Sequence, residues 1–256
     1  MAERLVPAIV LHLRDYGEAD LLVTFLTPTR GCLTGMAKYA KRSRRRFAHC
    51  LEPLNRVDFF LAPSRGELEF IQKGELVRSF PGLRQDLRRL GAAAVLAELS
   101  GLLAGPPGAY ARIFFTLEEA LGLLEAGAPA DSLLPALLLR LLTLGGYGPR
   151  LESCLGCALE PAPPLYFSIP RGGVLCGACS RGAKGPVVPL HLGTLKLLRL
   201  AQSLPLNKLS RLRFPPQQRH QSLGMFKAFL RHHLGRDLKS WSFWEKMSAR
   251  AGGQSF

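Results

Sequence analysis

The sequence predicts an α+β protein with a five-stranded OB-type β-barrel over residues 1–80. A helical domain over 81–256 follows, and it contains an inserted four-cysteine module at about 150–187. Three observations lead to this prediction. Short β-rich segments separated by turn signals fill the first 80 residues. From residue 81 onward, apolar residues recur at helical spacing. Two Cys-x-x-Cys pairs then interrupt the helical pattern.

Five segments of the N-terminal part are expected to be strands, at 5–13, 21–27, 32–38, 54–61 and 68–77. The tetrapeptide PTRG is a tight-turn signal and joins the second and third segments as a hairpin. A longer loop separates the third segment from the fourth. This strand count favours a small closed barrel of the OB type, which binds nucleic acid on strands 2 and 3 and on flanking loops.

The second part is expected to be helical. The stretch DSLLPALLLRLLTLGG has helical periodicity and a Gly-rich stop, with Asp131 as its expected N-cap. Its most apolar portion, 133–144, contains Arg140 and is shorter than the roughly 20 residues that span a bilayer. We therefore expect a buried core helix and no membrane association. Further helices are expected within 83–105, 109–127, 189–203, 217–234 and about 238–247.

The composition indicates an acidic partner. The net charge is +15 and the pI is about 10.1, which fits nucleic acid, an anionic membrane or an acidic protein. The net charge is +4 over 1–80, zero over 81–150 and +11 over 151–256. The N-terminal segment lacks a long apolar core and a cleavage site, so we expect no signal peptide and a cytosolic protein with reduced thiols.

A dense basic run follows the third expected strand. It reads YAKRSRRRF, and such a run is usually a solvated charged segment or a nuclear-type signal. Here its ends would be anchored between barrel strands, so its cations would be held above one surface and could neutralise phosphates. We expect the DNA contacts to be Lys38, Tyr39, Lys41, Arg42, Arg44, Arg45 and Arg46, extended by Arg14 and Arg30.

Two aromatic residues at the ends of the run have alternative roles. Tyr39 could stack on bases or pack at a strand end, whereas core packing is the favoured role of Phe47. The cations beyond residue 150 are rival contacts for DNA or an acidic protein: Lys184, Lys196, Arg199, Lys208, Arg211, Arg213, Arg219 and Lys227. Trp241, Phe243 and Trp244 are expected to dock the last helix into the core.

The spacing of four cysteines predicts a metal site. Cys154, Cys157, Cys176 and Cys179 form two Cys-x-x-Cys pairs separated by 18 residues, and two such turns supply four thiolates in a tetrahedron, which suits Zn²⁺. A pair of disulfides or an iron–sulfur cluster is the alternative. Four protein thiolates leave no open position, so one structural zinc ion is expected.

No catalytic motif accompanies these features. The sequence contains no phosphate-binding Gly-x4-Gly-Lys-Ser/Thr, no Gly-x-Ser-x-Gly and no His-Glu-x-x-His. Beyond residue 150 there are four carboxylates, so paired-carboxylate chemistry is poorly supplied. We therefore expect that the protein is not an enzyme.

Several motifs, in the same order along the chain, resemble a known family. AIVLHLRDYGEADLLVTFLTPTRG, LEPLNRVDFFL, GGYGPRLESCLGC…LYFSIPRGGVLCGAC and HHLGRDLKS together make the chain similar to the RecO family of bacterial DNA-repair proteins, nearly end to end. The resemblance implies an OB-fold, a helical domain and a zinc module that some relatives lack. It implies binding of single- and double-stranded DNA and annealing of complementary strands.

The resemblance also implies partners. The family works with RecR, and sometimes RecF, to help load RecA onto strands coated by single-stranded-DNA-binding protein, whose acidic-hydrophobic tail it contacts. Our functional hypothesis is therefore a non-enzymatic recombination mediator. A protein-interaction adaptor with incidental DNA affinity and a zinc-containing nuclease are the alternatives.

Overall fold

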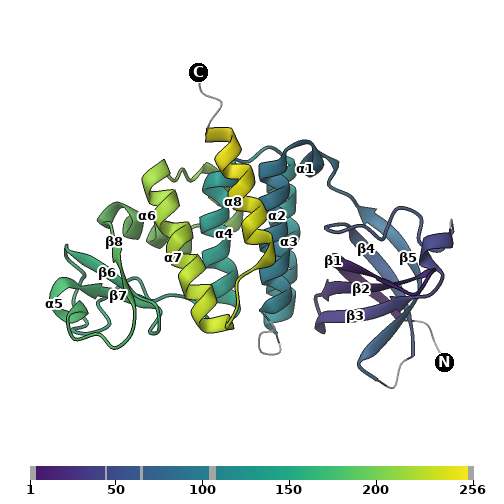
Figure 1. Cartoon of the computed structure of the whole chain (residues 1–256), viewed down its shortest axis with the longest axis horizontal. Helices are drawn as coiled ribbons and strands as arrows, with labels where there is room; N and C mark the ends of the chain where they lie inside the picture. The colour runs from purple at the N-terminus through teal and green to yellow at the C-terminus, as the bar shows by residue number, and fades with distance from the viewer. Residues whose placement is uncertain (1–3, 44, 64–65, 104–107, 253–256) are drawn as a thin grey trace. The chain divides into compact units, whose positions relative to one another are not determined.

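The chain forms two compact units, Met1–Gly127 and Ala128–Phe256, in a computed structural model (Figure 1). The structure describes residues 4–43, 45–63, 66–103 and 108–252. Each unit has its own core and is described separately.

The first unit begins with a closed β-barrel, which confirms the expected OB-type fold. Its strands are β1 (Arg4–Tyr16), β2 (Asp20–Thr27), β3 (Gly31–Ala37), β4 (Arg56–Ala62) and β5 (Leu68–Arg78). They follow one another around the barrel in the order β1-β2-β3-β5-β4. The pairing of β3 with β5 is parallel, and the other pairings are antiparallel.

Alternation along the strands forms the barrel core. Inward residues of β2 and β4 meet where the Phe25 and Phe59 rings pack edge to face, with centroids 5.1 Å apart. Glycine allows close approach at Gly74, where a Cβ atom would lie 2.7 Å from the sulfur of Cys50. Cys50 is fully buried in this core, and burial raises the pKa of its thiol to about 11. It is therefore a packing residue, which is the usual role of a buried free cysteine.

Three helices complete the first unit: α1 (Pro81–Gln85), α2 (Leu87–Leu102) and α3 (Ala109–Glu125). The carboxylate of Asp86 caps α2 by accepting hydrogen bonds from the backbone N–H groups of the following turn. Both α2 and α3 contact barrel strands, and the ring of Tyr110 lies against Gly31. The barrel ends at Arg78, but the compact unit continues to Gly127. A domain boundary between residues 80 and 81 stays a prediction.

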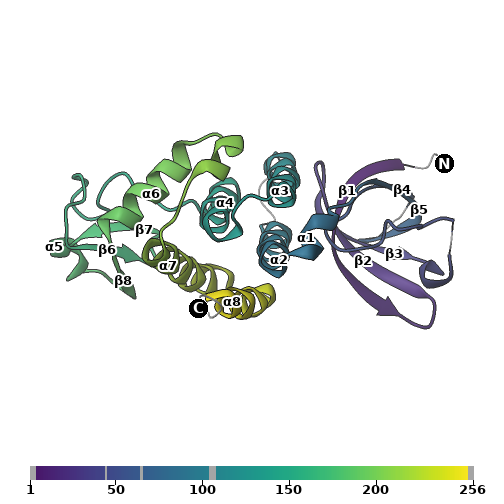
Figure 2. The same ribbon diagram turned by 90° about the horizontal axis from the view of Figure 1, so that it is seen from above.

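The second unit is built around helix α4 (Ala130–Leu144). The helices that accompany it are α6 (Leu192–Ser203), η2 (Leu206–Arg211), α7 (Pro216–Leu234) and α8 (Lys239–Gly252). Helices α4, α6 and α7 pack against one another (Figure 2). The leucines of α4 from Leu133 to Leu142 are buried, as expected of a core helix. Among the described residues, no helix combines the length and apolar composition that a membrane span requires.

The expected N-cap of α4 is wrong. Pro129 occupies the N-cap position, so Asp131 lies inside the first turn. Its carboxylate instead pairs with Arg219 of α7 at 2.9 Å. A carboxylate in the first turn is still favourable, because it faces the positive end of the helix dipole.

The cysteine module lies between α4 and α6 in the sequence. Its elements are β6 (Leu165–Ser168), β7 (Gly173–Cys176), α5 (Gly177–Ser180) and β8 (Val187–Leu190). The strands form a small antiparallel sheet in the order β7-β6-β8. Such a module has little apolar interior, so a further crosslink would add much to its stability.

Candidate nucleic-acid interface and metal centre

The basic run begins directly after β3, and its first residues are tied to the β1–β2 turn. Tyr39 has a left-handed backbone with φ of 55°, and its N–H donates to a carboxylate oxygen of Asp20 at 2.7 Å. Lys41 lies in the short helix η1 (Ala40–Arg42), where its N–H donates to the carbonyl of Ala19 at 3.1 Å. These bonds fix the position of the run at one end of the barrel.

The far end of the run is fastened to the barrel through Arg46. The carbonyl of Arg46 accepts a hydrogen bond from the N–H of Gly74 in β5 at 2.8 Å. Its guanidinium donates to the carbonyl of Lys38 at 2.7 Å and lies 5.2 Å from the centroid of the Phe47 ring. Phe47 is 5% exposed and belongs to the barrel core. The structure therefore places Phe47 in the packing role and gives Arg46 a structural role of its own.

The cations between these anchors face solvent. Lys41 pairs with Asp15 at 3.0 Å and Arg42 pairs with Glu18 at 3.8 Å. The side chain of Asp15 is 76% exposed and that of Glu18 is 93% exposed, so each pair contributes about 0–1 kcal/mol. Arg45 is exposed and has no ion pair within the described ranges. Arg44, the cation of the run not yet placed, lies outside the described residues.

Two further predicted contacts lie at opposite ends of the β-strands. Arg14 is exposed on β1, next to Asp15, and so lies at the same end as the run. Arg30 lies in the turn between β2 and β3 and pairs there with the buried carboxylate of Glu69, which also pairs with Arg4 at 3.5 Å. The length of β3 separates Arg30 from the run by about 20 Å. The structure brings Arg14 to the run and does not bring Arg30 there.

Tyr39 retains the feature that stacking requires. Its ring is 62% exposed, in contrast to the buried ring of Phe47. An exposed ring beside several cations can contact a base while the cations contact phosphates.

The four predicted metal cysteines come together in the second unit. All four sulfur atoms lie within 4.8 Å of one another. A tetrahedral ion with metal–sulfur bonds of about 2.3 Å requires sulfur–sulfur distances of about 3.8 Å. The cluster therefore fits a single metal ion with small side-chain adjustments.

Local backbone structure forms the two turns of the cluster. The N–H of Leu155 donates to the carbonyl of Val174 at 2.8 Å, which fastens the first turn to β7. Glycine is required at Gly156, where a Cβ atom would lie 2.6 Å from the sulfur of Cys179. At Gly177 a Cβ atom would lie 2.7 Å from the ring of Pro164. Both glycines of the motifs thus allow the close packing that brings the sulfurs together.

The thiols of the cluster interact strongly with one another. Burial acts to raise the pKa of the Cys154 thiol. Backbone N–H groups of Cys157, Cys176 and Gly156 donate to its sulfur, outweigh burial and lower that pKa to about 6. Hydrogen bonds with Cys176 and then with Cys154 raise the pKa of Cys179 to about 12. If all four sulfurs were deprotonated they would repel one another at this distance, and a bound cation would relieve that repulsion, so the geometry is that of a candidate metal site.

Several cations of the second unit have structural partners. Arg199 of α6 donates to the carbonyls of Leu151 and Glu152 at 2.9 and 2.7 Å, and so holds the segment that leads into the first cysteine turn. Arg219 pairs with Asp131. Lys208 and Arg211 of η2 are exposed and therefore remain rival contacts for a polyanion.

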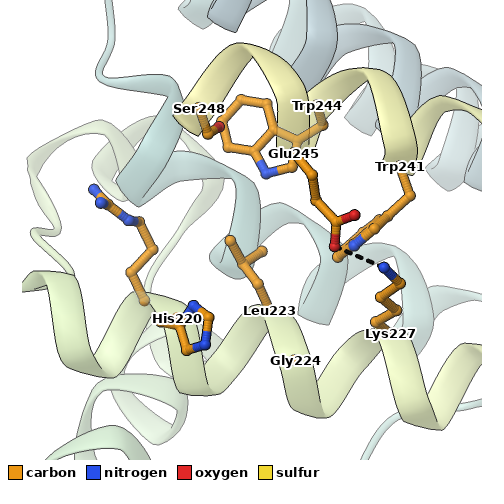
Figure 3. A pocket seen from close by; sticks show the side chains of 9 residues that line it. His220, Leu223, Gly224, Lys227, Trp241, Trp244, Glu245 and Ser248 are labelled. Carbon is orange, nitrogen blue, oxygen red and sulfur yellow. Dashed lines mark hydrogen bonds and ion pairs between the residues drawn. The ribbon is translucent and has the colours of Figure 1, made fainter. Parts of the chain in front are cut away.

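A pocket of about 430 Å³ lies between α7 and α8 (Figure 3). Trp241 and Trp244 are both buried, which confirms that they dock the last helix, whereas Phe243 between them is half-buried. Across the pocket, Lys227 pairs with Glu245 at 2.6 Å. The pocket is lined by Arg219, His220, Leu223, Gly224, Lys227, Trp241, Trp244, Glu245 and Ser248.

Comparisons with known proteins agree with the motifs. The family model described as "Recombination protein O N terminal" matches residues 1–80, and the model described as "Recombination protein O C terminal" matches 84–242. The chain belongs to the RecO family. "DNA repair protein RecO" of Pelotomaculum thermopropionicum is 35% identical over 246 residues, covering 96% of this chain and 95% of that protein. The protein of the same name from Anaeromyxobacter dehalogenans (strain 2CP-C) is 36% identical over 248 residues, covering 96% and 97%.

Membership in the RecO family accounts for the barrel and the motifs, but sequence reasoning missed other features of the site. The α7–α8 pocket draws its residues from two helices and has no short motif. The bonds of Arg46 and Arg199 to carbonyls were also missed, because a basic residue gives no signal of which backbone oxygen it will meet. A weak signal for Arg46 was its position directly before an apolar aromatic residue.

Proposed function

We propose that this member of the RecO family is a DNA-repair and recombination mediator. It binds single- and double-stranded DNA, anneals complementary strands and, with RecR and in some cases RecF, helps RecA load onto strands coated by single-stranded-DNA-binding protein. The observation that carries the proposal is the row of exposed cations held at one end of an OB-type barrel. The names of the relatives support the assignment to DNA repair.

The basic run would act on the phosphate backbone. Lys41, Arg42 and Arg45 would neutralise phosphates and release counterions, and Arg side chains can also bind phosphate with two parallel hydrogen bonds. Two strands held on such a surface repel each other less, which lowers the electrostatic barrier to pairing. The sequence-independent character of phosphate contacts suits a protein that must anneal any pair of complementary strands.

The cysteine cluster would hold one Zn²⁺ with a structural role. Four thiolates are the ligand set of closed zinc sites, and zinc is the usual ion for two Cys-x-x-Cys turns. The ion would fasten the first turn to β7 and α5, and so stabilise a module with little core. Elemental analysis of freshly purified, reduced protein should give about one zinc per chain, and a metal-free protein with an intact module would contradict this assignment.

We propose no enzymatic activity for the protein, and its proposed location is the cytoplasm, at the nucleoid.

An adaptor function with incidental DNA affinity is the competing proposal, favoured by the α7–α8 pocket and its buried tryptophans. An annealing assay with labelled complementary strands distinguishes these functions. It is run without ATP, in the presence and in the absence of divalent metal. Annealing without cleavage supports the mediator, metal-dependent cleavage supports a nuclease, and tight binding of the coat protein without annealing supports the adaptor.

A pair of matched variants tests the DNA contact. The double change Lys41→Ala with Arg45→Ala removes two exposed cations of the run. Lys208→Ala with Arg211→Ala removes the same charge from the second unit. For single strands, the first pair should lower the slope of log affinity against log salt by about 1.4 and leave folding intact. An equal effect of both pairs would show that net charge, and not the run, governs binding.

A further inference from the structure

The outer face of the barrel at β4 and β5 carries two aromatic rings that the core does not use. Phe70 of β5 is 37% exposed and Phe60 of β4 is half-buried. Their neighbours Leu61 and Ile71 point inward and are buried in the barrel core. Alternation along each strand therefore places both rings on the outer face.

Strand register brings the two rings close together. Ala62 lies opposite Phe70, and Phe60 is two residues before Ala62 on the same strand. Phe60 itself lies opposite Lys73, because a β-bulge at Gln72 shifts the register between the two pairs. Apolar residues flank the two rings on the neighbouring strands, because Met36 of β3 pairs with Phe70 and Leu5 of β1 pairs with Phe60.

A lysine lies over each of these rings. The ammonium of Lys38 is 5.7 Å from the centroid of Phe70, and that of Lys73 is 5.0 Å from the centroid of Phe60. Lys73 also pairs with Glu75, which is half exposed. Alternating rings and cations on an exposed face are the composition of surfaces that bind single strands, where rings stack on bases and cations follow the backbone.

The aromatic face is continuous with the basic run. Lys38 directly precedes the run and also covers Phe70. The carbonyl of Arg46 is bonded to Gly74, the residue after Lys73. Positive charge therefore continues without a gap from the run to β5 and β4, so a nucleic-acid strand bound to the run can extend over both.

We propose that Phe60 and Phe70 form a stacking platform for the unpaired bases of a single nucleic-acid strand. A base would replace the ammonium over each ring, and Lys38 and Lys73 would then contact the adjacent phosphates. The inference rests on the proposed DNA binding and deepens it, since it assigns single-strand contacts to β4 and β5 and not only to the run. Duplex DNA keeps its bases stacked internally, so the platform distinguishes single strands from duplexes.

Phe60→Ala and Phe70→Ala test the platform, with Phe115→Ala as the control. Phe115 of α3 is 57% exposed and lies on a helix of the same unit. Each platform variant should bind an oligothymidylate about tenfold more weakly than wild type, with an unchanged salt slope and unchanged duplex affinity. Phe70→Trp should retain affinity and add a tryptophan fluorescence that the oligonucleotide quenches. The control should match wild type.

An abasic oligonucleotide of the same length completes the design. Wild type should bind it about as weakly as the platform variants bind oligothymidylate, and the variants should lose no further affinity. Platform variants that match the control, while Lys41→Ala with Arg45→Ala binds weakly, would overturn the platform and leave the proposed function standing. Wild type that binds no single strand would overturn both. Equal losses on abasic and normal strands, or loss of binding to a protein partner alone, would show that the face is not a base platform.

Discussion

Gly156 makes the closest approach to the cysteine cluster and gives the sharpest test of it. A methyl group at this position would lie 2.6 Å from the sulfur of Cys179 and 2.7 Å from its Cβ atom. Ordinary contact begins near 3.4 Å, so Gly156→Ala would displace the Cys179 side chain by about 0.8 Å. Metal–ligand distances tolerate only about 0.2 Å. We therefore expect Gly156→Ala to weaken metal binding by at least tenfold, as loss of a supporting contact does at other metal sites.

Competition between the protein and a chromophoric chelator measures this loss. Gly182→Ala is the matched control, because it lies in the same module and a Cβ atom there would have no neighbour within 4 Å. The thermal midpoint of Gly156→Ala should also depend less on added chelator than that of wild type, since metal binding stabilises the folded module.

Two results would refute the reasoning. If Gly156→Ala holds metal as tightly as Gly182→Ala, the sulfur of Cys179 is not a ligand held in the observed place. If neither protein changes its thermal midpoint with chelator, the four cysteines do not hold a structural ion. A loss of metal with normal DNA annealing would leave the structural assignment intact and separate the module from the DNA contact.

Three further predictions follow from individual side chains. Asp15→Asn with Glu18→Gln removes two exposed carboxylates beside the run, so it should strengthen DNA binding and steepen its salt slope in anisotropy titrations. Unchanged binding would show that DNA does not contact this part of the run. Asp86→Ala should lower the free energy of unfolding by about 1 kcal/mol in denaturant titrations, whereas Asp86→Asn should keep most of the cap. The hydrogen bond from Arg231 lowers the pKa of Asp237, so the pair stabilises the fold above the ordinary aspartate pKa and this contribution is lost as pH falls through the lowered value. The thermal midpoints of wild type and Asp237→Asn should therefore converge in acid, and a constant difference would contradict the pairing.

The strands of the barrel were predictable because their signals are local. Alternation and turn residues are visible within a few positions, and the hairpin joined by PTRG forms as expected, with Thr27 paired to Gly31. Barrel closure depends instead on the parallel pairing of β3 with β5, which joins Thr34 to Leu68 although the basic run and the whole of β4 lie between them in the sequence. Such pairing leaves no periodic signal in either strand, and the fold class was inferred from strand count and not from pairing.

The helix cap at α4 shows how local reasoning fails. Asp131 has a good capping side chain, but Pro129 has a fixed φ and no N–H, so the helix begins two residues earlier than expected, at Ala130. Tertiary contact then decides the outcome, because Arg219 on α7 offers the carboxylate a charged partner. The cysteine cluster was the opposite case: its four members were predicted from spacing alone, since a Cys-x-x-Cys turn fixes the positions of its own sulfurs.

The carboxylates beside the basic run clarify how one surface can both hold and release a strand. Lys41 and Arg42 are paired with Asp15 and Glu18 through exposed contacts of about 0–1 kcal/mol each. A phosphate can therefore replace either carboxylate at small cost, and the counterions released from DNA favour the exchange at low salt. As salt rises this gain falls, while the backbone bonds of Tyr39 and Lys41 still hold the loop in place. The proposed annealing function needs this combination, because both strands must be released once base pairing has replaced their contacts with the loop.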